Sequence, residues 1–262
     1  MLRQLQSTSK TKNPLLKPLT RLKNEDNLQW GTRAVADMGT GGSDGWTYVV
    51  LLGGNDTLSF RLRVAQSQLR SDMLPSYWSE AVLARLRGER VARARALHVP
   101  LLQPAQGVFA TRTNGVVDRP MRDFADPDHW PNIALIALPI AQTQILEKVE
   151  TFKRSRGTLD ALEHILRWLA FAWGAARTPN PLTDGIGLPS ACMLEIACAA
   201  AKFDLTPGLE SRASCPEAIW VAAMRWHEYF ENFIGQRPVG RYFTPHIYPI
   251  DEGEAANDSR RK

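Results

Sequence analysis

The chain has 262 residues, of which 44% are apolar and 23% charged, the composition of an ordinary globular protein rather than a disordered or collagenous one. Its three cysteines, an odd number without paired C-x-x-C spacing, argue against a disulfide framework and give no signal for a zinc site. The formal net charge of +5 arises at the N-terminus, because residues 1–24 carry six basic side chains and no acid, whereas residues 25–262 hold 26 basic and 27 acidic side chains.

Residues 1–27 are expected to form a basic, flexible arm, because they contain two prolines and no sustained apolar period. Three interpretations fit this arm: a solvated tail, an organellar transit peptide, or a segment that lies on the phosphates of a nucleic acid. No apolar core follows the charges, so a secretory signal is not expected, and no stretch reaches the ~18 to 20 apolar residues of a membrane span. Nucleic-acid contacts would come from Arg3, Lys10, Lys12, Lys17, Arg21 and Lys23.

Residues 28–140 are expected to form a β-rich part of an α+β fold, beginning with a hairpin over residues 46–66. Leu58–Val64 alternate apolar and polar side chains with the strand period of two, and Gly53–Asp56 could supply the turn. Between this hairpin and the next, residues 78–98 have a helical pattern that is interrupted at Gly88.

A second hairpin is predicted over residues 107–121, because Asn114 and Gly115 both tolerate the positive φ that a two-residue turn requires. The continuous apolar run at residues 132–140 is typical of a strand buried on both faces.

Residues 141–235 are expected to be helical, and residues 236–262 to form a C-terminal extension and disordered tail. Glycine and proline separate four predicted helices, at residues 142–156, 158–176, 189–203 and 215–233. The helix at 189–203 is apolar nearly all round, so it should be central. The prediction is therefore an α+β fold with a strand-rich N-terminal half (two hairpins plus a buried strand) packed on a C-terminal four-helix half, and residues 28–235 could form one composite domain.

The last predicted helix contains a cysteine, a glutamate and a histidine that suggest an active site. Ser214 and Glu217 have the S-x-x-E spacing of a capping box, which makes Ser214 the expected N-cap. Twelve residues separate Cys215 from His227, so an intact helix holds them about 18 Å apart, too far for a nucleophile and its base. Cys215 could still be activated by the helix N-terminus.

A dense acidic segment, D-F-A-D-P-D-H-W at residues 123–130, offers candidate metal ligands. Asp126 and Asp128 would bind a divalent ion for hydrolytic chemistry, with His129 as a further ligand or proton shuttle. The other interpretation is a turn, because Asp126 precedes a proline and aspartates in turns bond their own backbone.

Two other segments carry weaker signals. The glycine-rich residues 39–45 could hold a phosphate, but a strand rather than a helix is expected to follow them, which favours a flexible loop. Five arginines lie around Gly88 and would spread around a helix rather than gather on one side, which favours a salt-bridged surface: Arg85, Arg87, Arg90, Arg93 and Arg95.

No complete catalytic set emerges, so the sequence favours a non-catalytic protein-interaction or regulatory component, an accessory protein of a multi-protein system. A bacterial source fits the excess of 24 arginines over eight lysines, and the free cysteines favour a cytoplasmic location. Eight tryptophans could supply a partner surface if several are exposed. No cofactor is expected. The alternatives are a metal-dependent hydrolase or nuclease that uses the Asp126–His129 segment, and nucleic-acid binding through the arm.

Overall fold

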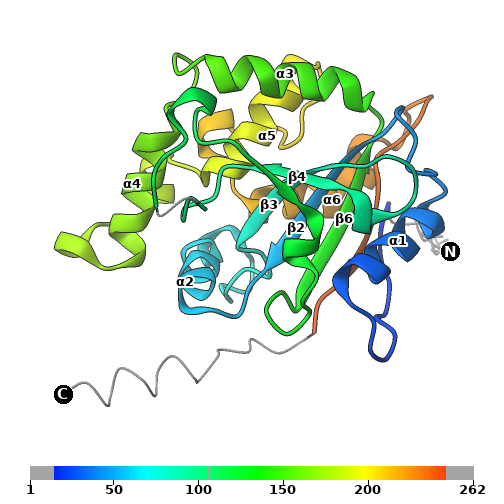
Figure 1. Ribbon diagram of the computed structural model, residues 1–262, viewed down its shortest axis with the longest axis horizontal. Helices are drawn as coiled ribbons and strands as arrows, with labels where there is room; N and C mark the ends of the chain where they lie inside the picture. Colours follow the sequence, from blue (N-terminus) through cyan, green and yellow to red (C-terminus); the bar gives the residue numbers. More distant parts are fainter. Residues whose placement is uncertain (1–14, 105–106, 246–262) are drawn as a thin grey trace, which may run out of the picture.

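The computed structural model describes residues 15–104 and 107–245, which fold around a seven-stranded sheet (Figure 1). The order across the sheet is β1-β7-β6-β2-β3-β4-β5. β1 and β7 are parallel, and each other neighbouring pair is antiparallel. The strands are β1 (Leu16–Pro18), β2 (Thr47–Gly53), β3 (Glu80–Arg85), β4 (Arg95–His98), β5 (Val117–Pro120), β6 (Asn132–Leu138) and β7 (Val239–Phe243).

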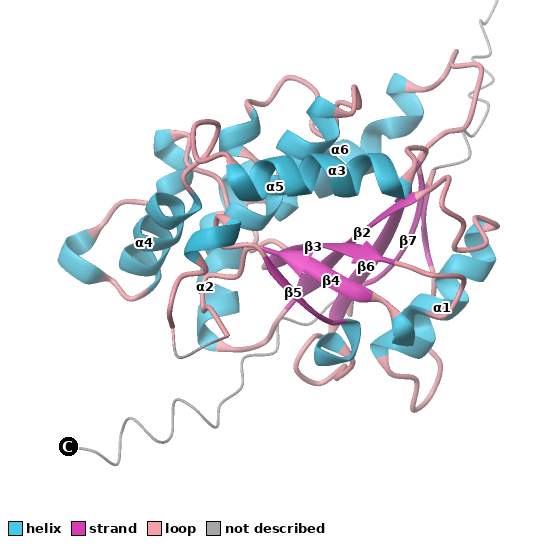
Figure 2. Cartoon of the chain, turned by 45° about the horizontal axis from the view of Figure 1, so that its top comes forward, coloured by secondary structure: helices cyan, strands magenta, loops and turns pink. Residues whose placement is uncertain are grey.

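Helices cover both faces of this sheet, which establishes an α+β class (Figure 2). One face carries α3, α5 and α6, and α1 lies on the other. Within the described ranges the α-helices are α1 (Asn27–Met38), α2 (Thr57–Ala65), α3 (Gln142–Arg154), α4 (Ala161–Ala172), α5 (Pro189–Ala200) and α6 (Pro216–Tyr229).

The centre of the sheet is apolar on both faces, as predicted for residues 132–140. Every residue of β2 and β6 is buried, and the β2 side chains alternate between two cores. Val49 and Leu51 join the larger core beneath α3, α5 and α6, whereas Val50 and Leu52 join the smaller core beneath α1. The period of two therefore places successive side chains of one strand in two different cores.

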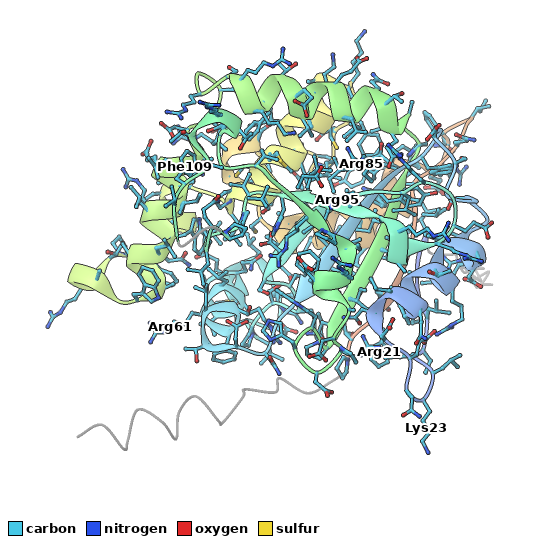
Figure 3. The ribbon with its side chains drawn as sticks, viewed as in Figure 1. Arg21, Lys23, Arg61, Arg85, Arg95 and Phe109 are labelled. Atoms are coloured by element: carbon cyan, nitrogen blue, oxygen red, sulfur yellow. The ribbon has the colours of Figure 1, made fainter. Side chains whose placement is uncertain are left out.

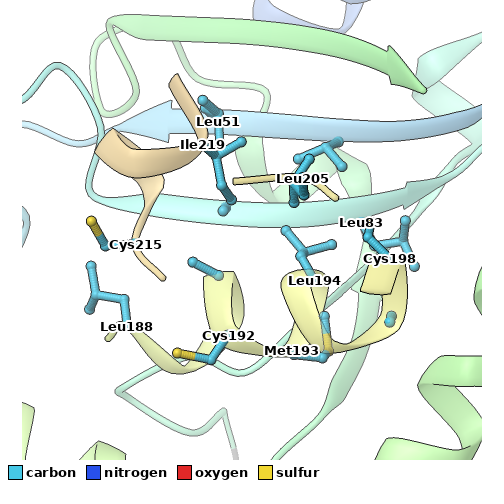
Figure 4. Packing of buried hydrophobic residues seen from close by; sticks show 14 of the residues in the cluster. Leu51, Leu83, Leu188, Cys192, Met193, Leu194, Cys198, Leu205, Cys215 and Ile219 are labelled. Carbon is cyan, nitrogen blue, oxygen red and sulfur yellow. The ribbon is translucent and has the colours of Figure 1, made fainter. Parts of the chain in front are cut away.

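Helix α5 is central, as its nearly uniform apolar sequence predicts. Cys192, Met193 and Leu194 of α5 lie in one cluster with Leu83 of β3 and Ile219 of α6 (Figure 4). The stretch Pro181–Ala200 is long and apolar enough for a membrane span, but 67% of its most apolar window is buried inside the structure, as in the core helix of a soluble protein.

The predicted strand at Leu58–Val64 is wrong, because this segment forms α2. Asp56 caps the helix by accepting a hydrogen bond from the Ser59 amide at 2.9 Å. Arg63 is fully buried and donates to the carbonyl oxygens of Ser76 and Gly54 at 2.7 and 3.1 Å, so its guanidinium is hydrogen-bonded inside the fold. The first predicted hairpin is therefore absent from the described ranges: β2 pairs with β3 and β6 instead.

The predicted helix at residues 78–98 is also wrong, since this segment contains β3 and β4. The two strands pair with Arg85 opposite Arg95, which are both labelled in Figure 3. Both arginines contact Asp118 of β5, at 3.5 and 2.7 Å. These two arginines therefore belong to a salt-bridged surface, although the surface is made by strands. The spacing of the apolar residues was compatible with either period over so short a run.

Asn114 and Gly115 adopt positive φ as expected, yet they do not connect two paired strands. A short 3-10 helix, Thr111–Thr113, precedes them, and β5 pairs with β4. Asn114 is fully buried, donates to the Leu159 carbonyl at 2.8 Å and accepts from the Ala161 amide at 3.2 Å. Its side chain therefore fixes the start of α4, a tertiary function that the local turn pattern does not reveal.

A helix lies within each of the four predicted helical segments, but the chain does not divide into a strand half and a helical half. β7 follows the helices and inserts between β1 and β6. β1 lies within residues 1–27, so the described part of the segment expected to be a flexible arm contributes a strand. Residues 1–14 and 246–262 lie outside the described ranges.

Candidate functional site

A cavity of about 360 Å³ opens where β3 begins and β4 ends. We call it the His98 pocket and define it by the elements that line it: the ends of these strands, the first turns of α2 and α5, residues 99–102, and the loop that carries His129 and Trp130. Because β3 and β4 are antiparallel, the first residue of β3 and the last residue of β4 lie at the same end of the strands. Glu80 and His98 are therefore close together.

His98 is the unusual side chain of this pocket. It is only 2% exposed, and neither ring nitrogen has a hydrogen-bond partner. Its Nδ1 lies 3.4 Å from a carboxylate oxygen of Glu80, within ion-pair range but without the angles of a hydrogen bond. Phe124 packs edge-on against the ring, with centroids 5.6 Å apart. Buried polar groups normally have hydrogen-bond partners, so a buried imidazole beside a cavity with no hydrogen bond at either nitrogen is an exception that needs a physical reason.

The start of α5 forms another wall of the pocket. Its N-cap, Leu188, provides no side-chain acceptor, and Pro189 occupies the first turn. The Ser190 hydroxyl accepts from the Val99 amide and donates to the Val99 carbonyl, both at 3.0 Å, which joins α5 to the residue after His98. First-turn amides of a helix have no acceptor within the helix, so the amides of Ser190 and Ala191 carry the positive end of its dipole.

Charged side chains form the outer part of the pocket. Asp56, the cap of α2, accepts from the Ser59 hydroxyl at 2.6 Å and lies 3.9 Å from the Nε2 of His129. Arg119 pairs with Asp123 at 2.8 Å and lies 5.2 Å over the Phe124 ring, within the ~6 Å of a cation–π contact. Both signs of charge are therefore present at the mouth.

Of the three predicted metal-site residues, the structure brings one, His129, to this pocket. Asp126 accepts from the Asp128 amide at 2.9 Å, the hydrogen bond of an Asx turn. The backbone carbonyl of Asp128 accepts from the side chain of Asn55. In the described ranges no three His, Cys, Asp or Glu side chains form a group that could hold a metal ion. The metal hypothesis gains no support from this geometry and stays a prediction.

The cysteine and histidine of α6 are far apart, because the helix runs unbroken from Pro216 to Tyr229. The N-cap is Cys215 rather than the predicted Ser214, and it makes no side-chain cap. Burial raises the pKa of the Cys215 thiol to about 12, so desolvation outweighs the helix dipole. His227 lies near the other end, with Nδ1 3.2 Å from the carbonyl of Met224.

Glu217 does not complete a capping box either, because its carboxylate accepts from the Ser76 hydroxyl at 2.6 Å and lies 3.6 Å from Arg70. The Gln66 side chain accepts from the Glu217 amide at 2.9 Å and so caps α6 from another segment. Burial raises the pKa of Glu217 to about 7, against the opposing influence of Ser76 and Arg70.

Only half of the predicted nucleic-acid residues lie in the described ranges: Lys17, Arg21 and Lys23. Arg21 contacts Asn27 and lies 4.8 Å over the Phe243 ring, and burial lowers its pKa. Lys23 projects from the surface (Figure 3). Arg3, Lys10 and Lys12 lie outside the described residues, so binding through the arm stays a prediction.

Sequence reasoning missed Glu80 and His98, because it assigned residues 78–98 to a helix. A strand interpretation would have placed the two residues at the ends of a β-hairpin. The long Gly88 connection, rich in arginine, obscured that signal.

No family model, curated protein or solved structure matches this chain.

Proposed function

We propose that the protein is a non-catalytic recognition component that binds a ligand in the His98 pocket. The single observation that carries this proposal is the buried imidazole of His98, whose two nitrogens have no hydrogen-bond partner while the ring lines a 360 Å³ cavity. An unpaired buried polar group costs about 1 to 3 kcal/mol. A ligand that bonds this imidazole removes the cost, so the pocket has an energetic reason to be filled.

Binding is favoured over covalent catalysis because the hydroxyl groups that line the pocket are already engaged. Ser190 is bonded twice to Val99, and Ser79 accepts from the Gly54 amide at 3.0 Å. Ser59 donates to Asp56, but this pair belongs to the cap of α2, where Asp56 also accepts from the Ser59 amide. The three cysteines are buried, and desolvation raises the pKa of each thiol. A nucleophile must be free to reach a substrate and must have an adjacent base.

The size of the pocket agrees with recognition of a small molecule or of one end of a larger one, since binding cavities span roughly 300 to 1,000 Å³. The tryptophans are a poor basis for an interaction surface, because four are fully buried: Trp30, Trp78, Trp168 and Trp226. Trp173 is 64% exposed and has no exposed tryptophan beside it in the described ranges. The tryptophans therefore do not support a partner surface, and the proposed recognition function depends on the His98 pocket.

The test is a fragment screen by ¹H–¹⁵N correlation spectroscopy on the full chain. Bound fragments should shift the amides of residues 98–102 and 190–192. His98→Leu, which keeps the volume of the side chain but removes its nitrogens, should abolish these shifts. His227→Leu, at a histidine outside the pocket, should not. The proposal fails if no fragment shifts these amides, or if His98→Leu binds the same fragments equally well.

A further inference from the structure

We infer that the ligand of the His98 pocket is a singly charged carboxylate attached to an apolar body. This inference rests on the proposed function and adds the chemical class of the ligand. Free carboxylic acids and the C-terminal residue of a peptide share this chemistry.

The anionic end is indicated by two independent features that line the same cavity. The first is the N-terminus of the twelve-residue helix α5, whose cap supplies no side-chain acceptor to the first-turn amides. The second is His98, 2% exposed and unpaired, on the residue next to the Val99 backbone that Ser190 holds. The first-turn amides donate to a negatively charged oxygen, and so does the imidazole when both of its nitrogens are protonated.

Glu80 determines which nitrogen of His98 faces the ligand. The carboxylate lies 3.4 Å from Nδ1, so a proton on Nδ1 is favoured electrostatically. Nε2 is then the nitrogen that remains for the ligand, and it donates to an anion only when the ring carries both protons. Glu80 also accepts from the Ala81 amide at 2.9 Å, which helps to hold it in place.

The apolar body of the ligand is indicated by the remaining walls. Leucines of three separate segments line the pocket together with an aromatic pair, Phe124 and Trp130, whose ring centroids are 5.5 Å apart. The leucines are Leu58, Leu62, Leu101, Leu102 and Leu188. Such walls gain free energy by covering apolar groups, whereas sugars and nucleotides present hydroxyl and phosphate groups that these side chains leave unbonded.

The charge of the ligand follows from the acids that share the pocket. Glu80 and Asp56 both line it, and its arginine, Arg119, is already paired with Asp123. A phosphate dianion would meet two carboxylates without a free guanidinium to balance them. A single negative charge at the α5 terminus and His98 is compatible with these neighbours.

The experiment measures dissociation constants at pH 6.5 by following the amides of residues 98–102 and 190–192. The probes are 4-phenylbutyrate, N-acetyl-Ala-Leu with a free carboxylate, the uncharged amides of both compounds, and inorganic phosphate. We expect at least one carboxylate to bind at least ten-fold more tightly than its own amide, and phosphate to leave these signals in place. Tight binding of phenylbutyrate alone assigns a free acid, and tight binding of the peptide alone assigns a peptide C-terminus.

Two variants test whether His98 is responsible for the preference for a carboxylate. His98→Leu should lose the preference for carboxylate over amide, whereas His227→Leu should keep it. The comparison of each carboxylate with its amide in the unmodified protein needs no variant, so it stands even if His98→Leu fails to fold.

The outcomes separate this inference from the proposed function. Equal binding of amide and carboxylate, or preferential binding of phosphate, overturns the carboxylate assignment but leaves a ligand-binding pocket. The assignment also falls if neither carboxylate binds while other fragments occupy the pocket. If nothing shifts the pocket amides, both the inference and the proposed function are wrong.

Discussion

Individual buried polar residues carry much of the specificity of this fold. Asn114, Glu217 and His98 are all nearly or fully buried, and each has a different arrangement of partners. Asn114 is bonded to two backbone groups, Glu217 is bonded to a hydroxyl beside an arginine, and His98 has no hydrogen-bond partner. The first two therefore have evident structural functions, whereas His98 does not.

Replacing Asn114 with alanine should reduce stability by about 2 to 4 kcal/mol, because it leaves a buried carbonyl and a buried amide unpaired and forces alanine into a left-handed backbone at φ 47°. The measurement is equilibrium unfolding in urea. Asn24→Ala is the matched control, since Asn24 also has positive φ, 62°, but an exposed side chain. A loss no larger than that of the control would show that the buried hydrogen bonds do not matter.

Glu217 predicts a specific pH dependence of stability. Its pKa in the folded protein is raised from 4.5 to about 7. Its contribution to folding stability is therefore fully present below pH 4.5 and is lost as the pH rises through 7. The free energy of unfolding of Glu217→Gln, relative to that of the unmodified protein, should therefore rise by roughly 2 to 3 kcal/mol from pH 5 to pH 8. Glu228→Gln, at a 61% exposed site on the same helix, should show no such rise in its free energy of unfolding. Parallel pH profiles of the two variants would contradict the burial of this carboxyl.

At the scale of secondary structure, the elements with long and consistent patterns were predictable and the short ones were not. The apolar run at residues 132–140 and the four helical segments are long enough for one period to dominate. Residues 58–64 alternate like a strand, yet the Asp56 cap and the burial of Arg63 against two carbonyls favour a helix. That compensation depends on residues brought together only by folding, so the local pattern does not contain it.

The candidate site was unpredictable for the same reason. Its principal pair comes from the two ends of a hairpin that the sequence pattern predicts as a helix, and its helix terminus comes from residue 188 onwards. The prediction that did reach the site was His129, which lies at its mouth.

The loop at residues 126–131 should behave as a turn in solution. Asp126→Ala should cost about 1 kcal/mol, the usual net value of one hydrogen bond, because the Asp128 amide loses its acceptor. Mg²⁺, Mn²⁺ and Zn²⁺ should leave the Tm of the unmodified protein unchanged in a thermal scan. A rise in Tm that disappears in both Asp126→Ala and Asp128→Ala would instead support the metal hypothesis.

For the whole molecule, the N-terminal region is part of the sheet architecture. β1 pairs with β7, and the Leu19 carbonyl accepts from the indole nitrogen of the buried Trp30 at 2.9 Å. The region therefore connects the edge of the sheet to α1. A deletion that removes it changes stability as well as charge, which complicates any test of nucleic-acid binding by truncation.

Deletion of residues 1–24 should lower the Tm by several degrees, because it removes β1 and the acceptor of Trp30. The double substitution Lys17→Ala and Lys23→Ala removes two charges and should leave the Tm nearly unchanged. Binding of a single-stranded oligonucleotide by the unmodified protein, measured against salt and weakened by the double substitution, would support the nucleic-acid alternative. A deletion variant with the original Tm would contradict the structural function of β1.

The central claim is that the imidazole of His98 is available to a ligand. Long-range ¹H–¹⁵N spectra of the histidine rings test it most directly, because they report on each ring nitrogen separately. The account predicts that 4-phenylbutyrate or N-acetyl-Ala-Leu shifts the Nε2 signal of His98 and leaves both nitrogens of His227 in place. An Nε2 signal of His98 that stays constant through the titrations and through the fragment screen would contradict it.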